Sequence, residues 1–210
     1  MEIHAPEKPI LTIKEAAVHL SIVTVGILIA LSLEGAVEYV HHRRVVREAR
    51  EIMRQEIEAN RTELRRAMSH IKDKQLKEMQ DDIKLVTSIV KGEKPTPRMM
   101  IGYSTASLRS AGHSTAELMG AFAYMDYREV GQWAAVYDLQ ADFLRVQAAG
   151  LAEGTGAFSF LIGRDLLTTP VGQLESEADM LRRASGSLVV TSQFGRDLLQ
   201  AYDSVLAEKK

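Results

Sequence analysis

Residues 16–33 read AAVHLSIVTVGILIALSL, a run of 18 residues without a single Asp, Glu, Lys or Arg. As an α-helix this run would be about 27 Å long at 1.5 Å per residue, close to the hydrocarbon thickness of about 30 Å in a bilayer. Charged residues flank it, with Lys14 and Glu15 before the run and Glu34 after it. The run therefore predicts a transmembrane helix.

A cleaved signal peptide is the main alternative interpretation of this run. Residues 1–15 contain three Glu and two Lys, whereas a signal peptide starts with a positively charged region. No clear A-x-A cleavage sequence follows the run. We therefore expect a short tail in residues 1–15 and a retained anchor, with its interfacial end, in residues 16–40.

Basic residues are more numerous after the run than before it. Only Lys8 and Lys14 precede it, while four arginines follow it, namely Arg43, Arg44, Arg47 and Arg50. The positive-inside rule then favours the cytoplasm for the C-terminal part of the chain, with the periplasm as the alternative. The same stretch supplies the candidate contacts to lipid headgroups, which are His41, His42, Arg43, Arg44 and Arg47.

A helical apolar pattern continues from Ala49 to Val90. Its members recur about every 3.7 residues, which is close to the 3.6 residues in one turn of a straight helix. Two of the members, Asn60 and Gln75, are polar. We predict a basic amphipathic stalk helix over residues 41–91. Two prolines in the sequence GEKPTP end it and predict a loop over residues 92–103.

Residues 104–210 are predicted to form a helical domain. We expect helices near 104–119 and 126–150, a helix break at 150–156 where three glycines gather, and a short helix near 158–167. The last helix, 172–208, has a heptad pattern in which steps of four and three alternate. Its members are Leu174, Ala178, Leu181, Ser185, Leu188, Ser192, Gly195, Leu199, Tyr202 and Leu206.

Charge favours packing of this last helix against the stalk. Residues 43–91 contain 13 basic and 9 acidic residues, whereas residues 126–210 contain 8 basic and 12 acidic residues. The alternative is a homodimer or a helical protein partner that binds through Leu174, Leu181, Leu188, Leu199 and Leu206. Together the patterns predict an all-α protein: a transmembrane helix continues into a long stalk helix, which packs with further helices as an antiparallel bundle.

Motifs for catalysis are weak. The chain has no Cys, which excludes disulfides and thiolate chemistry. The sequence GHSTA from Gly112 lacks the closing glycine of a nucleophile elbow. Adjacent His41 and His42 diverge by about 100° on a helix and do not form a metal site. We predict neither an enzyme nor a metal or cofactor site, and the net charge of −2 gives no indication of a nucleic-acid partner.

Aromatic residues cluster along one part of the chain. Helical spacing of Trp133 and Tyr137 favours a place in the core, and a small-ligand pocket is the alternative interpretation. The cluster contains Phe122, Tyr124, Tyr127, Trp133 and Tyr137.

The chain resembles a family of uncharacterised bacterial single-pass membrane proteins. The resemblance rests on MEIHAP at residues 1–6, HLSIVTVGILIALSLE at 19–34, the pair His41-His42, GAFAYMDYREV at 120–130 and Val136-Tyr137. It implies membrane anchoring and a helical domain, and it brings no activity or functional residues. We expect the anchor to lie in the bacterial inner membrane. The sequence thus predicts an interaction or scaffold protein, with a ligand-binding sensory bundle as the alternative.

Overall fold

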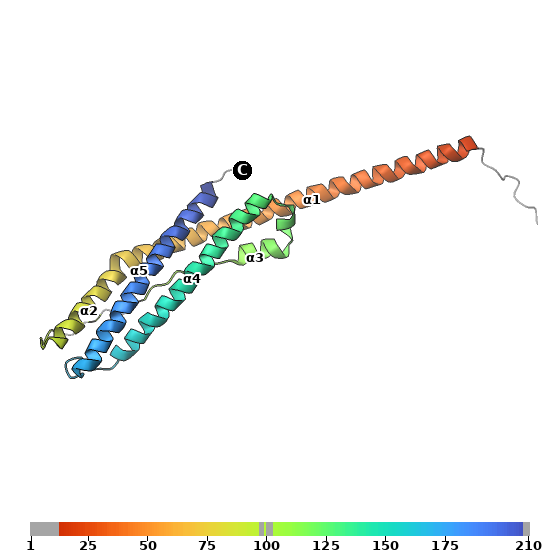
Figure 1. Ribbon diagram of the computed structural model, residues 1–210. Helices are drawn as coiled ribbons and strands as arrows, with labels where there is room; N and C mark the ends of the chain where they lie inside the picture. The colour runs from red at the N-terminus through yellow and green to blue at the C-terminus, as the bar shows by residue number, and fades with distance from the viewer. Residues whose placement is uncertain (1–12, 97–98, 100–102, 208–210) are drawn as a thin grey trace, which may run out of the picture. The chain divides into compact units, whose positions relative to one another are not determined.

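The computed structural model describes residues 13–96, 99 and 103–207, and these residues form an all-α structure without strands (Figure 1). This confirms the predicted all-α fold with a long N-terminal helix. The elements are α1 (Ile13–His70), the π-helical turn η1 (Ile71–Gln75), α2 (Leu76–Val90), α3 (Ala111–Leu118), the 3-10 helix η2 (Ala121–Tyr124), α4 (Tyr127–Leu161) and α5 (Val171–Ala207).

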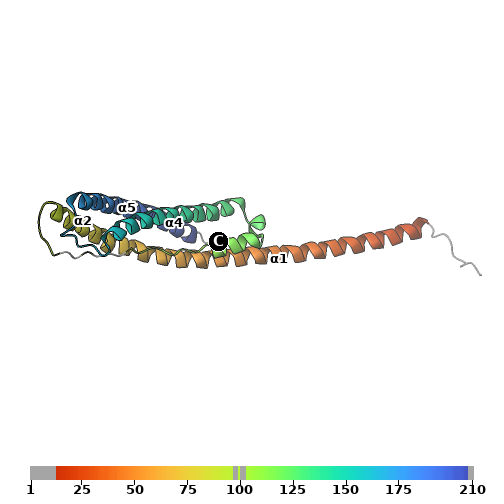
Figure 2. The same ribbon diagram turned by 90° about the horizontal axis from the view of Figure 1, so that it is seen from below.

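The chain divides into two compact units between Arg47 and Glu48. In the first unit, the described residues belong to the N-terminal part of α1. The second unit contains the rest of α1 and all of the packed helices. It is a bundle in which α5 packs against both α2 and α4 (Figure 2).

Helix α5 runs antiparallel to α1 and α2, as predicted, but α4 runs parallel to α1. Arg54 on α1 donates to the carbonyl oxygen of Leu206 on α5 at 2.7 Å, and farther along α1 Met68 lies against Gly195. In contrast, Arg50 pairs with Glu129 on α4, and Asn60, which follows Arg50 on α1, bonds to Gln140, which follows Glu129 on α4. Residue numbers therefore increase in the same direction along both helices. A parallel pair needs a long return connection, which the chain supplies between α2 and α3.

The predicted apolar stripe of the stalk faces the bundle core without interruption from Ala49 to Met79, and again at Val86. Steps of four residues from Ala67 to Met79 would rotate the stripe away from the core on a regular α-helix. The wider turn of η1 accommodates the additional residues, so the stripe stays buried. Its buried members are Ala49, Met53, Ile57, Asn60, Leu64, Ala67, Ile71, Gln75, Met79 and Val86.

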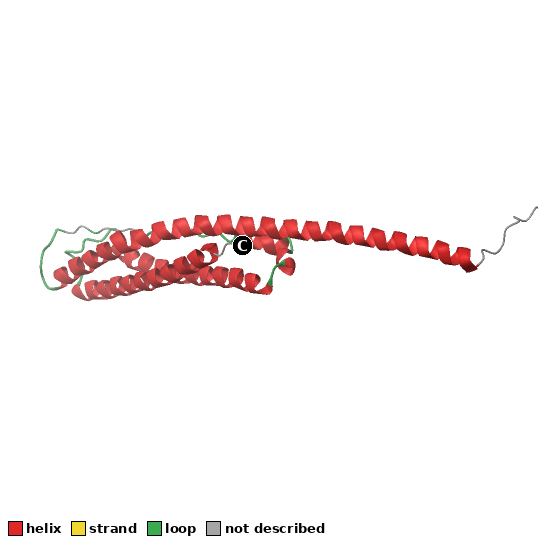
Figure 3. Cartoon of the chain, turned by 90° about the horizontal axis from the view of Figure 1, so that it is seen from above, coloured by secondary structure: helices red, strands yellow, loops and turns green. Residues whose placement is uncertain are grey.

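Residues 103–110 are extended, where the sequence predicted the start of a helix. This return segment lies beside the helices (Figure 3). The side-chain amide of Asn60 bonds to both the N–H and the carbonyl of Arg109, at 2.9 and 2.7 Å. Gln147 does the same to Ala106, at 2.7 and 3.0 Å. These amides saturate backbone groups that a helix would have used internally, so the helical prediction for 104–110 is wrong.

The predicted break at residues 150–156 is also wrong, because α4 continues to Leu161. The glycines instead make room for Tyr103 of the return segment. A Cβ atom at Gly154 would lie 3.0 Å from the Tyr103 ring, and one at Gly150 would lie 2.7 Å from its hydroxyl. Helix α4 therefore absorbs the first part of the predicted short helix, and turns follow to residue 169.

We expect Gly154→Leu to lower the free energy of unfolding by about 2 kcal/mol, because the new side chain overpacks against Tyr103. The matched control is Gly156→Leu in the same helix, where a Cβ has open space and loss of glycine favours the helix. Fluorescence of Trp133, the only tryptophan, reports unfolding. Equal stability of the two variants would contradict the close packing of Tyr103 against Gly154.

Candidate functional site

The apolar segment, residues 16–33 of α1, is uncovered on all sides. Its large apolar side chains from Val18 to Leu33 are each between 54 and 67% exposed. The most apolar 18-residue window of this helix has a mean hydropathy of 2.3 and no buried residue. A core helix of a soluble protein would be mostly buried. By length and composition α1 is able to cross a membrane, and an N-terminal signal sequence would meet the same criterion.

Hydroxyl groups within the apolar segment are satisfied by the helix itself. Ser21, Thr24 and Ser32 each donate to the carbonyl oxygen four residues earlier, at 2.8, 2.8 and 2.7 Å. Such bonds remove the cost of placing a free hydroxyl in hydrocarbon. The segment therefore presents an essentially apolar surface.

The residues that follow the apolar segment carry amphipathic and basic side chains. The Arg43 guanidinium lies 5.5 Å from the centroid of the Tyr39 ring, and His42 Nε2 lies 3.7 Å from the Glu38 carboxylate. The rings of His41 and His42 are 6.0 Å apart. Tyrosine and arginine are residue types of the membrane interface. In the part of the chain that the structure describes, no group of three or more His, Cys, Asp or Glu is placed to hold a metal.

The structure separates the predicted aromatic cluster into two groups. Trp133 and Tyr137 are buried on α4, at 4 and 8% exposure, as is Phe143. Phe122 lies 5.3 Å and Tyr137 lies 4.4 Å from the ring of His113, measured between centroids. Tyr124 and Tyr127 are instead exposed to solvent, so the five residues do not line one site.

Glu56 of α1 fixes the start of α3. Its carboxylate accepts hydrogen bonds from the Tyr137 hydroxyl and the Gly112 N–H, both at 2.8 Å, and from the His113 N–H at 3.4 Å. A carboxylate at a helix N-terminus also interacts favourably with the helix dipole. Burial and the adjacent Glu56 raise the pKa of Tyr137, so this hydroxyl stays protonated and donates.

Three buried side chains link the helices at the centre of the bundle. The Gln140 side-chain oxygen accepts from Asn60 at 3.0 Å and from the Tyr202 hydroxyl at 2.5 Å. The Gln140 amide nitrogen donates to the carbonyl of Arg109 at 2.9 Å. One network thus connects α1, α4, α5 and the return segment. In it, the polar groups of Asn60, Gln140 and Tyr202 bond to each other or to the backbone of Arg109.

A two-point ion pair joins α1 and the first turn of α4. The Arg50 guanidinium donates to both carboxylate oxygens of Glu129 at 2.6 Å, and Glu129 is buried. The hydrogen bond with Glu129 raises the pKa of Arg50. This fork-like geometry sets the register between the two parallel helices.

Glu177 of α5 is a fully buried carboxylate whose two oxygens have no hydrogen-bond partner among the described residues. Burial raises its pKa to about 7, and the positive charge of Arg164 partly offsets this rise. A buried carboxylate without hydrogen bonds favours its protonated form. Glu177 is therefore a titratable group inside the bundle.

Comparisons of the chain with protein-family models, curated proteins and solved structures give no match. The candidate sites consequently rest on geometry alone.

Neither the burial of Glu177 nor the role of Asn60 was predicted from the sequence. Asn60 was visible as a polar member of an apolar stripe, which signals a buried polar contact. Glu177 begins a second heptad row on α5, followed by Ala184, Thr191, Leu198 and Val205, all of them buried. A helix packed between two neighbours needs this wider face, and the single predicted seam was too narrow.

We expect Asn60→Ala to lower the free energy of unfolding by about 2–4 kcal/mol, because buried groups of Arg109 and Gln140 lose their partner. Hydrogen exchange at the Arg109 amide should accelerate as the return segment loosens. Thr62→Ala, which removes an exposed hydroxyl bonded within its own helix, is the control and should change stability little. Similar effects of both substitutions would contradict a role for Asn60 in holding the segment.

Glu177 should make the stability of the bundle depend on pH. Its pKa is about 7 in the folded chain against an ordinary value of 4.5, so the folded state binds the proton more tightly. The free energy of unfolding should fall as pH rises from about 4.5 to about 7, by on the order of 3 kcal/mol. Glu177→Gln should remove this fall and be the more stable protein above pH 7, while exposed Glu175→Gln should retain it. Identical pH profiles for Glu177→Gln and the unaltered chain would exclude this titration.

Proposed function

We propose that this chain is a membrane-tethered helical scaffold that presents its bundle to a protein partner. The observation that carries the proposal is the apolar segment of α1, which is exposed on every side of the helix. Water does not stabilise such a surface, and lipid does. The proposal assigns no catalytic step, no cofactor and no nucleic-acid partner.

Packing in the bundle supports a structural role over ligand sensing. The rings of Trp133, Tyr137 and Phe143 are buried in the core. Polar side chains such as Asn60 and Gln140 bond to the backbone of the return segment or to each other. Side chains used in this way hold the fold together. We therefore favour the scaffold over a sensory bundle with a pocket at the aromatic residues.

The heptad leucines of α5 are not free to bind a partner while α5 packs in its own bundle. Leu174, Leu181 and Leu188 are fully buried within the chain's own bundle, and Leu199 and Leu206 are half-buried. A homodimer through these five leucines would require α5 to exchange between two copies, as in domain swapping. We therefore propose that a partner binds the outer faces of the bundle.

We further propose the bacterial inner membrane as the location, with the bundle in the cytoplasm. The support for sidedness is the group of Arg43, Arg44, Arg47 and Arg50 after the apolar segment. Alkaline phosphatase fused after Lys210 tests it. An active fusion would place the bundle on the periplasmic side.

The tether predicts that the full chain sediments with membranes and resists extraction by alkaline carbonate. A pair of arginines, Ile27→Arg with Leu28→Arg, should release it, since each arginine at the centre of a membrane helix costs about 3 kcal/mol on insertion scales. The control pair is Val189→Arg with Val190→Arg, two neighbouring exposed apolar residues of α5. Recovery of the unaltered chain in the supernatant without detergent would refute the tether.

A further inference from the structure

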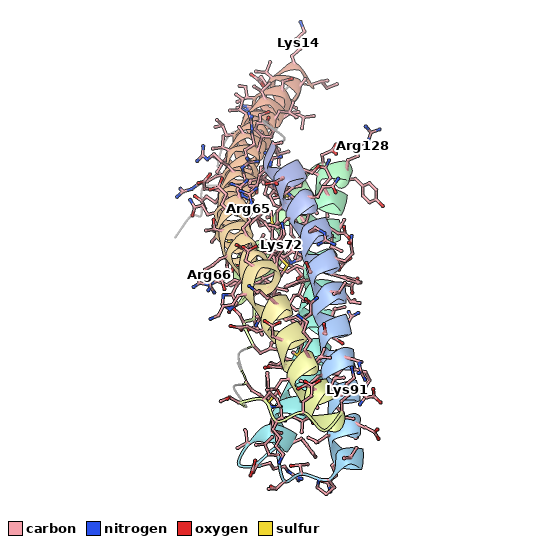
Figure 4. All side chains as sticks on the ribbon, turned by 90° about the vertical axis from the view of Figure 1, so that its left-hand side faces the viewer. Lys14, Arg65, Arg66, Lys72, Lys91 and Arg128 are labelled. Carbon is pink, nitrogen blue, oxygen red and sulfur yellow. The ribbon has the colours of Figure 1, made fainter. Side chains whose placement is uncertain are left out.

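Residues 162–170, the connecting loop, join α4 to α5 at one end of the second unit. Figure 4 shows Lys91 of α2 at the same end, and Arg128 from the start of α4 at the other end. Leu166 in the middle of the connecting loop is 5% exposed and packs into the bundle. The chain leaves α4 through Gly163, whose φ of +75° is one that other residues rarely adopt. The connecting loop is thus anchored by Leu166 and begins at a flexible residue.

The connecting loop faces the buried carboxylate of Glu177. Helices α4 and α5 are antiparallel, and a Cβ atom at Gly150 of α4 would lie 3.5 Å from the Thr191 hydroxyl oxygen of α5. Glu177 precedes Thr191 by two heptads in the same buried row, so it lies level with the residue two heptads after Gly150. That residue is Arg164, beyond the end of α4 at Leu161. The positive charge of Arg164 accordingly acts on Glu177.

Arg164 contacts two uncharged groups. Its guanidinium donates to the side-chain oxygen of Gln173 at 3.0 Å and lies 4.3 Å from the centroid of the Phe160 ring. These two residues belong to the ends of the helices that the connecting loop joins. An ionised carboxylate binds a guanidinium more strongly than a neutral amide oxygen does. Arg164 would therefore gain from exchanging Gln173 for an ionised Glu177.

Glu177 needs such a partner once it is ionised. It is fully buried, and neither of its oxygens has a hydrogen-bond partner among the described residues. A buried charge is costly unless a donor or an opposite charge accompanies it. Arg164 supplies the charge that acts on the pKa of Glu177. The other charged side chains at this end of the packed elements are Asp82 and Lys91 on α2, Glu153 on α4, Asp165 in the connecting loop, and Glu175 and Asp179 on α5.

We propose that the connecting loop is a pH-dependent switch, in which Glu177 releases its proton to solvent and Arg164 leaves Gln173 to pair with the carboxylate. While Glu177 is protonated, the carboxyl group stays covered and Leu166 stays in the core. When Arg164 moves to Glu177, the loop turns about Gly163 and withdraws Leu166. The switch concerns the second unit alone and does not depend on the proposed tether.

A nitroxide spin label on a single cysteine tests the switch, because the chain has no cysteine of its own. Leu167→Cys places the label in the connecting loop, at a position that is 46% exposed. Val190→Cys is the matched control, a 49% exposed position on α5 away from the loop. In the full chain in detergent, the label at Leu167→Cys should become more mobile as pH rises, with a midpoint near pH 7. The label at Val190→Cys should not change.

Substitutions in the labelled chain identify the groups that drive the change. Glu177→Gln should abolish the transition, and exposed Glu175→Gln should retain it. Arg164→Gln should move the midpoint to higher pH, because the positive charge that favours the ionised carboxylate is lost. Its control is Arg182→Gln, which removes an arginine that pairs with Asp179 at 2.6 Å and should leave the midpoint in place.

Four results would overturn the switch. One is a label at Leu167→Cys whose mobility does not change with pH, and another is the same transition in the Glu177→Gln background. An equal transition at Val190→Cys would show that the whole bundle responds rather than the connecting loop. An unchanged midpoint in Arg164→Gln would show that this arginine does not pair with the carboxylate.

Discussion

Helix α1 presents apolar side chains on all sides between Val18 and Leu33, but along a single stripe from Ala49 onward, which continues through η1 to Met79 of α2. The two patterns need different surroundings. An all-round apolar surface is stable where the solvent is lipid, while a stripe is stable where other helices cover it and water reaches the rest. The bundle covers the stripe, and we propose that a bilayer covers the apolar segment. The remaining helices, the return segment and the proposed location all depend on this change of pattern within one helix.

The parallel arrangement of α1 and α4 imposes the next constraint. A chain that leaves α2 at one end of the bundle must return to the other end before α4 begins, and its backbone must be hydrogen-bonded where it is buried. Asn60 and Gln147 meet this need with two bonds each, and Gly154 leaves space for Tyr103. Burial of the Asn60 and Gln147 side-chain amides costs free energy. Their hydrogen bonds, however, hold the return segment in one position. This explains why polar side chains occupy positions that the helical period assigns to the core.

Periodicity was sufficient to predict the all-α class, the stalk helix and the extent of α5, because long amphipathic helices repeat their pattern many times. It failed where packing between distant segments decides the conformation. The glycines near Gly154 resemble a helix break until Tyr103 is placed against them, and residues 104–110 resemble a helix until Asn60 and Gln147 take their backbone groups. Glu177 could have been found from the second heptad row, although the absence of a hydrogen-bond partner for it among the described residues depends on the packing of α5.

The most direct test is a scan of single cysteines along α1, η1 and the start of α2 in native membranes, read by reaction with a water-soluble maleimide. Within residues 20–31 every position should be protected, whichever side of the helix it faces. Within residues 48–79 protection should follow the buried stripe, with Met53 and Ile57 protected and Gln55 and Glu58 reactive. Reaction on one side of the helix within residues 20–31 would show that protein or water, rather than lipid, surrounds this segment and would contradict the account.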